Sequence, residues 1–139
     1  MKPSILIKKK DKFFVEDVCI ESIIEKFGTP TYIYSKKRIV DNFKSLESAF
    51  ENVDHLICFA VKANSNLAIL NLLAKNGAGF DIVSGGELRR VIAADGDPKK
   101  IVFSGVGKTS EEIKLAIENN ILAFNIESED ELTRIQEIA

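Results

Sequence analysis

The 139-residue sequence contains no tryptophan, one histidine and two cysteines, and these shortages exclude several kinds of site. His55 has no cysteine or second histidine at metal-ligand spacing, so we expect no metal site. Cys19 and Cys58 lie far apart in apolar surroundings, which favours buried, reduced thiols over a disulfide. The longest apolar runs, such as residues 56–61, fall far short of the roughly 20 residues that a membrane span requires. We therefore expect no membrane-spanning segment.

The charge of the chain is nearly balanced, with 19 Lys and Arg against 21 Asp and Glu and a net charge of −2. Charges of both signs are interspersed, so no nucleic-acid partner is expected. The short basic run at residues 8–10 is typical of a solvated turn. The N-terminus lacks the apolar core of a signal peptide, which favours a cytoplasmic protein.

From residue 55 onward, short apolar runs alternate with amphipathic stretches. The runs cover residues 56–61, 79–83, 100–104 and 121–126. Each interval between them accommodates one helix and two short loops, and the runs themselves are typical of buried parallel strands. This is a βα repeat.

Helix boundary signals agree with the repeat. We expect helices after Asn66, from Gly86, after Thr109 or Ser110, and after Ser128. Upstream we expect a helix at 17–27, a strand at 31–34 and a helix at 36–50. The alternation predicts an α/β fold, either an open doubly wound sheet or a barrel. About four βα repeats alone favour neither architecture. A closed (βα)8 barrel typically needs about 250 residues, of which this chain supplies roughly half, so truncation is the simplest explanation.

One apolar run ends on Lys62, within the segment Phe59-Ala60-Val61-Lys62-Ala63-Asn64. Ligand sites of parallel α/β sheets lie at the carboxyl ends of the strands. A neutral lysine amine at such a place can attack an aldehyde and form a Schiff base. On position alone, a lysine that reaches from the strand end into solvent is the more ordinary explanation.

A second group of polar residues lies between Phe80 and Glu87, where the next strand ends and a helix begins. Gly85 and Gly86 allow close backbone approach, and free amides at a helix start suit an anion. A tight turn without a ligand explains the two glycines equally well. Asp81 lies inside the strand, where a carboxylate needs a partner, and Lys62 would serve.

A third loop ends in Gly107-Lys108-Thr109 and invites a comparison with nucleotide-binding loops. A phosphate-binding P-loop requires glycine five residues before Gly107, but Val102 stands there. No third glycine completes a dinucleotide-binding fingerprint after Gly105 and Gly107 either. Both kinds of nucleotide site are excluded on spacing.

Together these segments resemble the family of pyridoxal-phosphate decarboxylases that act on ornithine, arginine and diaminopimelate. The segment 59–64 is similar to the lysine signature of that family. Segments 77–88 and 101–109 are most similar to its diaminopimelate branch, and 28–30 and 124–128 agree with it. The resemblance covers residues 28–135.

The resemblance implies the N-terminal half of an alanine-racemase-type (βα)8 barrel over residues 36–139, after an N-terminal segment, 1–35. The rest of the barrel and a β-domain are then absent. It implies that Lys62 is the catalytic residue and binds pyridoxal phosphate covalently, and we expect Asp81 and Ser84 to be further cofactor-binding residues. The implied reaction converts meso-diaminopimelate, the amino-acid substrate, into L-lysine for lysine biosynthesis.

The resemblance also implies that the full-length protein is a homodimer, and that the isolated chain is inactive because other cofactor-binding residues lie outside it. Two alternatives stay open. The chain could be a non-catalytic half barrel that binds or regulates a partner through its open sheet edges. It could also belong to a decarboxylase for another basic amino acid.

Overall fold

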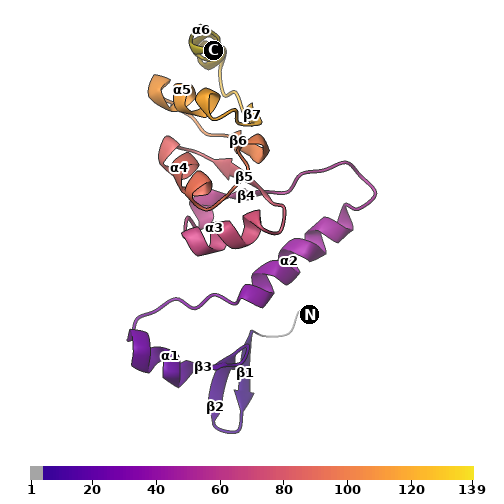
Figure 1. Cartoon of the computed structure of the whole chain (residues 1–139), viewed down its shortest axis with the longest axis vertical. Coiled ribbons are helices and arrows are strands. Elements are labelled where there is room, and N and C mark those ends of the chain that lie inside the picture. The colour runs from indigo at the N-terminus through magenta and orange to yellow at the C-terminus, as the bar shows by residue number, and fades with distance from the viewer. Residues whose placement is uncertain (1–4) are drawn as a thin grey trace. The chain divides into compact units, whose positions relative to one another are not determined.

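The computed structural model describes residues 5–139, and the chain divides into two units, Met1–Ala49 and Phe50–Ala139. Figure 1 shows the elements of each unit. The second unit contains all of the predicted βα repeat, so it carries the candidate site.

The first unit has a small antiparallel sheet and two helices. Its strands β1 (Leu6–Lys9), β2 (Lys12–Val15) and β3 (Val18–Cys19) are paired in the order β1-β2-β3. Helix α1 (Ile20–Phe27) is followed by Gly28, and α2 is Lys36–Ala49. The basic run at residues 8–10 thus belongs to β1 and the turn after it, rather than to a turn alone.

Two expectations for the first unit are wrong. The strand expected at 31–34 does not form, because no described strand pairs with this segment and only Ile33 within it is partly buried. The helix expected at 17–27 begins only at Ile20, because Val18 and Cys19 pair with β2. Both errors concern segments whose structure depends on the presence or absence of a partner strand.

The second unit is built on a parallel sheet of four strands. These are β4 (Cys58–Ala60), β5 (Gly79–Ile82), β6 (Ile101–Phe103) and β7 (Ala123–Phe124), in the order β4-β5-β6-β7. The short 3-10 turns are η1 (Val61–Ala63) and η2 (Pro98–Lys100), and the helices are α3 (Leu67–Ala74), α4 (Gly85–Ala93), α5 (Ser110–Glu118) and α6 (Glu129–Ile138). Figure 1 shows these helices following one another along the same side of the strands. The predicted βα repeats are confirmed.

The two faces of this sheet differ in character. On one face the side chains are fully buried against the helices: Phe80, Ile82, Ile101 and Phe103 are each 0% exposed. Alternate residues point to opposite faces, and register partners share a face. The other face therefore carries the aligned residues Ala60, Asp81, Val102 and Ala123, which are only partly buried or exposed.

The last three helices begin in the same way, with a capping Ser or Thr followed three residues later by Glu. The pairs are Ser84–Glu87, Thr109–Glu112 and Ser128–Glu131. In each pair the cap oxygen accepts a hydrogen bond from the amide of the glutamate. The glutamate carboxylates accept from backbone amides at or just before the cap, those of Val83, Thr109 and Glu127. All three strand-to-helix loops are thereby fixed.

Side-chain bonds also join successive loops at this edge. Arg90 of α4 donates to the carbonyl of Ser65, before α3, at 3.2 Å. Glu112 of α5 accepts from the amide of Gly85, at the start of α4, at 2.8 Å. The loops around the candidate site are thus connected to one another as well as to their own helices.

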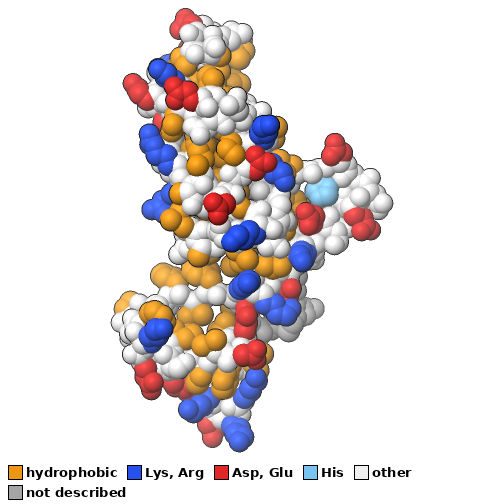
Figure 2. Space-filling model, viewed as in Figure 1, with side chains coloured by type: hydrophobic (Ala, Val, Ile, Leu, Met, Phe, Trp, Pro, Cys, Tyr) orange, Lys and Arg blue, Asp and Glu red, His pale blue; other side chains and the backbone are white. Residues whose placement is uncertain are grey.

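The surface carries charged side chains of both signs, interspersed on the face shown in Figure 2. This matches the near balance of 19 basic and 21 acidic residues. Among residues 5–139 the longest helix is α2, with 14 residues, and no helix there has the length and apolar character needed to cross a membrane.

Candidate functional site

The residues singled out from the sequence lie at the carboxyl edge of the parallel sheet. Lys62 is in η1, directly after β4. Asp81 is inside β5, where it is the register partner of Ala60. Ser84 is the N-cap of α4. Because parallel strands end at the same edge of a sheet, the structure brings these residues to one edge of the four-stranded sheet.

Lys62 combines a fixed backbone with a free amine. Its neighbour Val61 is 0% exposed, and the Val61 carbonyl accepts a hydrogen bond from the Asn64 amide at 3.0 Å. The Lys62 side chain is exposed, and within residues 5–139 no hydrogen bond or ion pair holds its ammonium. Such a lysine is available to a ligand that approaches the end of β4.

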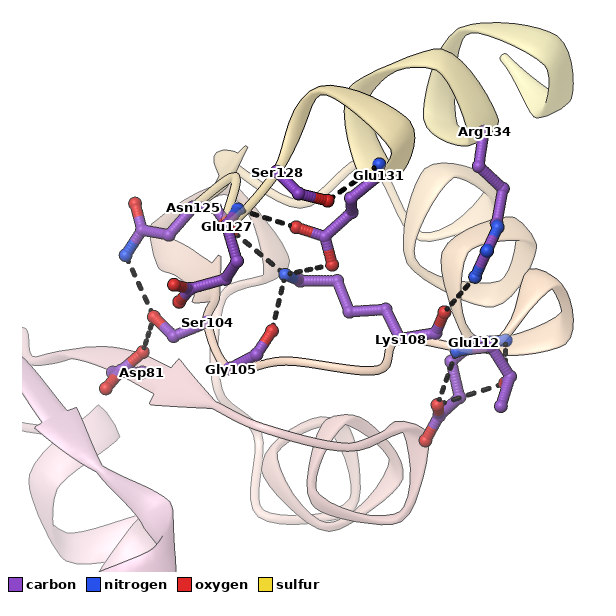
Figure 3. Close-up of polar contacts among 11 residues, drawn as sticks. Asp81, Ser104, Gly105, Lys108, Glu112, Asn125, Glu127, Ser128, Glu131 and Arg134 are labelled. Carbon is purple, nitrogen blue, oxygen red and sulfur yellow. Dashed lines mark hydrogen bonds and ion pairs between the residues drawn. The ribbon is translucent and has the colours of Figure 1, made fainter.

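Asp81 has a partner, but this partner is Ser104. The Ser104 hydroxyl donates to Asp81 Oδ1, and Asn125 Nδ2 donates to Ser104 Oγ at 2.8 Å (Figure 3). The expectation that Lys62 would pair with Asp81 is wrong, since no ion pair joins them in the described part of the chain. The row Asp81, Ser104 and Asn125 instead connects three neighbouring strands.

The charge of Asp81 also acts on β4. The register partner of Cys58 is Gly79, which stands two residues before Asp81 on β5. Residues two apart in a strand point to the same face, so Cys58 and Asp81 lie on the same face of the sheet. Burial raises the pKa of the Cys58 thiol, and the negative charge of Asp81 raises this pKa further. The electric field of the carboxylate therefore reaches the strand that leads to Lys62.

The turn between β5 and α4 uses most of its amides internally. Ser84 Oγ accepts from the Glu87 amide at 3.2 Å, and Glu112 Oε1 accepts from the Gly85 amide at 2.8 Å. The hydrogen bond from the Gly85 amide has the largest effect on the pKa of the Glu112 carboxyl and lowers it, and the hydrogen bond from the Thr109 amide lowers it further. The Gly86 amide and the proton of the Ser84 hydroxyl remain as donors for a ligand in this part of the structure.

Sequence analysis missed the most buried polar side chain among the described residues, that of Lys108, which is 1% exposed. Its ammonium donates to the carbonyls of Gly105 at 2.8 Å and Asn125 at 2.9 Å, and it forms an ion pair with Glu131 at 3.0 Å (Figure 3). All three donors of the ammonium are thereby used. Lys108 is thus a structural residue and leaves no donor for a nucleotide phosphate.

The loop around Lys108 explains why glycines precede it. Gly105 and Gly107 have φ values of 88° and 75°, which few other residues adopt. These two positions allow the chain to turn back so that the Gly105 carbonyl accepts from the ammonium three residues later. A lysine directly after Gly-x-Gly was the only sequence signal for this arrangement, and the same signal had suggested a nucleotide site.

Glu131 completes the Lys108 ion pair and is itself buried, with 8% of its side chain exposed. Burial pushes its pKa upward, but the bonds from the Glu127 amide and from Lys108 outweigh this effect, so its pKa is lowered. Asn125 belongs to both networks, because its carbonyl accepts from Lys108 and its amide group donates to Ser104 (Figure 3). The buried ion pair therefore supports the row that ends on Asp81.

Comparison with known proteins agrees with this arrangement. Residues 36–139 match the family described as pyridoxal-dependent decarboxylase, pyridoxal binding domain. Diaminopimelate decarboxylase of Pseudomonas fluorescens is 57% identical over 129 residues, and that of Pseudomonas aeruginosa is 54% identical over 128 residues. Each match covers 92% of this chain and 31% of the relative. The chain thus spans about a third of the length of these curated relatives.

Solved structures show the same similarity. A diaminopimelate decarboxylase from M. jannaschii in complex with L-lysine has a TM-score of 0.92 and 42% identity, covering 96% of this chain and 32% of that one. The crystal structure of AQ1208 from Aquifex aeolicus has a TM-score of 0.91 and 44% identity, covering 96% and 33%. The predicted fold, part of a (βα) barrel of the alanine-racemase type, is confirmed.

Proposed function

This chain belongs to the pyridoxal-dependent decarboxylase family, and from that premise we propose that Lys62 holds pyridoxal phosphate and that the whole protein converts meso-diaminopimelate into L-lysine. One observation carries the proposal: an amine without a partner in the described residues stands on a fixed turn at the carboxyl end of β4. The identity of 57% to a diaminopimelate decarboxylase supports the choice of substrate. The activity is proposed for the whole protein, of which this chain supplies the lysine.

The donor set at the sheet edge suits this cofactor. When bound, pyridoxal phosphate supplies an electron sink for the electron pair that departing carbon dioxide leaves behind. Lys62 would hold it through the amine nitrogen, and Asp81 would place a negative charge beside β4. The Ser84 hydroxyl and the Gly86 amide, at the N-terminus of α4, are donors that suit an anionic oxygen.

The proposal extends to the setting of the whole protein. Residues 36–139 would form part of the cofactor-binding barrel, after a separate segment, 1–35, in a cytoplasmic homodimer. The family match begins at residue 36, which supports the boundary after residue 35. Cys19 and Cys58 are free thiols, as is usual in a reducing compartment such as the cytoplasm.

Light scattering of the purified whole protein is expected to give twice the mass of its chain, and a monomer mass would contradict the dimer.

Carbon dioxide release by the whole protein tests the choice of substrate. With pyridoxal phosphate added, we expect release from meso-diaminopimelate to exceed release from ornithine and arginine in kcat/KM. Faster release from ornithine or arginine would assign the protein to another branch of the family. Cofactor binding without release from any of the three would favour the alternative, a non-catalytic binding module.

A further inference from the structure

A directed row of hydrogen bonds ends on Asp81. A hydroxyl has one proton to donate and two lone pairs that accept. The Ser104 proton goes to Asp81, and Ser104 Oγ accepts from Asn125 at 2.8 Å. Asn125 is held in turn, because its carbonyl accepts from the buried Lys108 at 2.9 Å. Each member of the row is therefore fixed by the one before it.

The position of Asp81 makes its orientation consequential. Asp81 is the register partner of Ala60, two residues before Lys62, and neighbouring strands lie about 4.8 Å apart. Asp81 is only half-buried, so without a fixed partner water would compete for its carboxylate. On the strands beside it, the titratable groups are Cys58 on β4 and Lys62 just beyond β4, since β6 and β7 contain none.

We propose that Ser104 and Asn125 are positioning residues that hold the Asp81 carboxylate toward β6, on the side of β5 away from β4, and so limit the charge felt at the nitrogen by which Lys62 holds its cofactor. The inference rests on the proposed function, because it concerns that same nitrogen. A negative charge held nearby favours the protonated form of the nitrogen. A carboxylate released from Ser104 would do so more, since it would lose the hydrogen bond that stabilises its charge and could turn toward β4.

The test is a spectroscopic titration of the whole protein with bound pyridoxal phosphate and no substrate. The pH midpoint of the cofactor absorbance change reports protonation of the nitrogen. We expect Ser104→Ala and Asn125→Ala each to raise the midpoint by about half a unit to one unit, which is part of the 1–3 units that a nearby opposite charge contributes. Asp81→Asn removes the negative charge and should lower the midpoint instead.

Two controls separate positioning from a general structural effect. Ser104→Thr keeps the hydroxyl and should restore a midpoint close to that of the wild type. Ser110→Ala makes the same kind of change at an exposed position, the first residue of α5, and should leave the midpoint unchanged. The exposed Asn125 offers a second variant whose folding does not depend on core packing, and a thermal melt checks each protein.

A double replacement identifies the route. If Ser104 acts through Asp81, adding Ser104→Ala to Asp81→Asn should cause no further shift. Additive shifts, or unchanged midpoints in Ser104→Ala and Asn125→Ala, would overturn the inference while the proposed function stands. A wild-type protein whose cofactor is not linked to Lys62 would overturn the proposed function, and the inference with it.

Discussion

Replacing Lys62 with alanine in the whole protein is expected to lower turnover of meso-diaminopimelate by several orders of magnitude, as the loss of a covalent catalytic group does in other enzymes. The side chain is exposed, so its removal opens no cavity and the melting temperature should stay close to that of the wild type. Carbon dioxide release and a thermal melt measure the two effects. Full activity in the alanine variant would overturn the proposed mechanism.

Reduction of the cofactor-loaded protein with borohydride, followed by peptide mapping, locates the lysine directly. The label is expected on Lys62. Lys75 is a matched control because it is also exposed, whereas Lys108 is buried with its three donors in use. Label on Lys75 or Lys108 and none on Lys62 would contradict the assignment.

Replacing Lys108 with methionine is expected to destabilise the protein by about 3–5 kcal/mol, the usual cost of removing one partner of a buried ion pair. The change leaves the Glu131 carboxylate buried without its counter-charge and removes the donor from the Gly105 and Asn125 carbonyls. Denaturant unfolding of the whole protein measures the loss. Lys114→Met, at an exposed position of α5, is the control and should change stability by less than about 0.5 kcal/mol. Equal losses in the two variants would argue against a special role for Lys108.

The same ion pair should make part of the stability dependent on pH. The folded-state pKa of Glu131 is lowered from its ordinary value of 4.5, so its contribution is complete above that value and is lost as the pH falls through the lowered folded pKa. The stability difference between the wild type and Glu131→Gln should therefore shrink as the pH falls below 4.5. A difference that stays constant between neutral and strongly acidic pH would contradict this.

The second unit could be predicted from the sequence because its strands are buried by helices that lie next to them in the chain. Apolar runs and capping residues such as Thr109 and Ser128 are local signals, and they predicted the repeats. The segment 31–34 shows the limit of local signals. Its residues favour a strand, but no described strand pairs with it, and this information is not local.

The candidate site shows the same division. Lys62 was identified because a buried strand ends on it, and Asp81 because a carboxylate inside a strand needs a partner. The partner of Asp81 was misassigned because Ser104 follows another strand, and only the register brings the two together. The burial of Lys108 could not be foreseen, since it requires acceptors from three loops or helices that are separate in the sequence.

The bonds between successive loops have a consequence for how the βα units respond to damage. Arg90 joins the βα unit β5–α4 to the preceding one, β4–α3, through Ser65. In the same way Glu112 joins β6–α5 to β5–α4, and the ion pair of Glu131 with Lys108 joins β7–α6 to β6–α5. Neighbouring βα units are also joined by the parallel ladders of their strands. Because each link lies at one boundary, its loss should loosen the contact between two neighbouring βα units and leave the other boundaries in place.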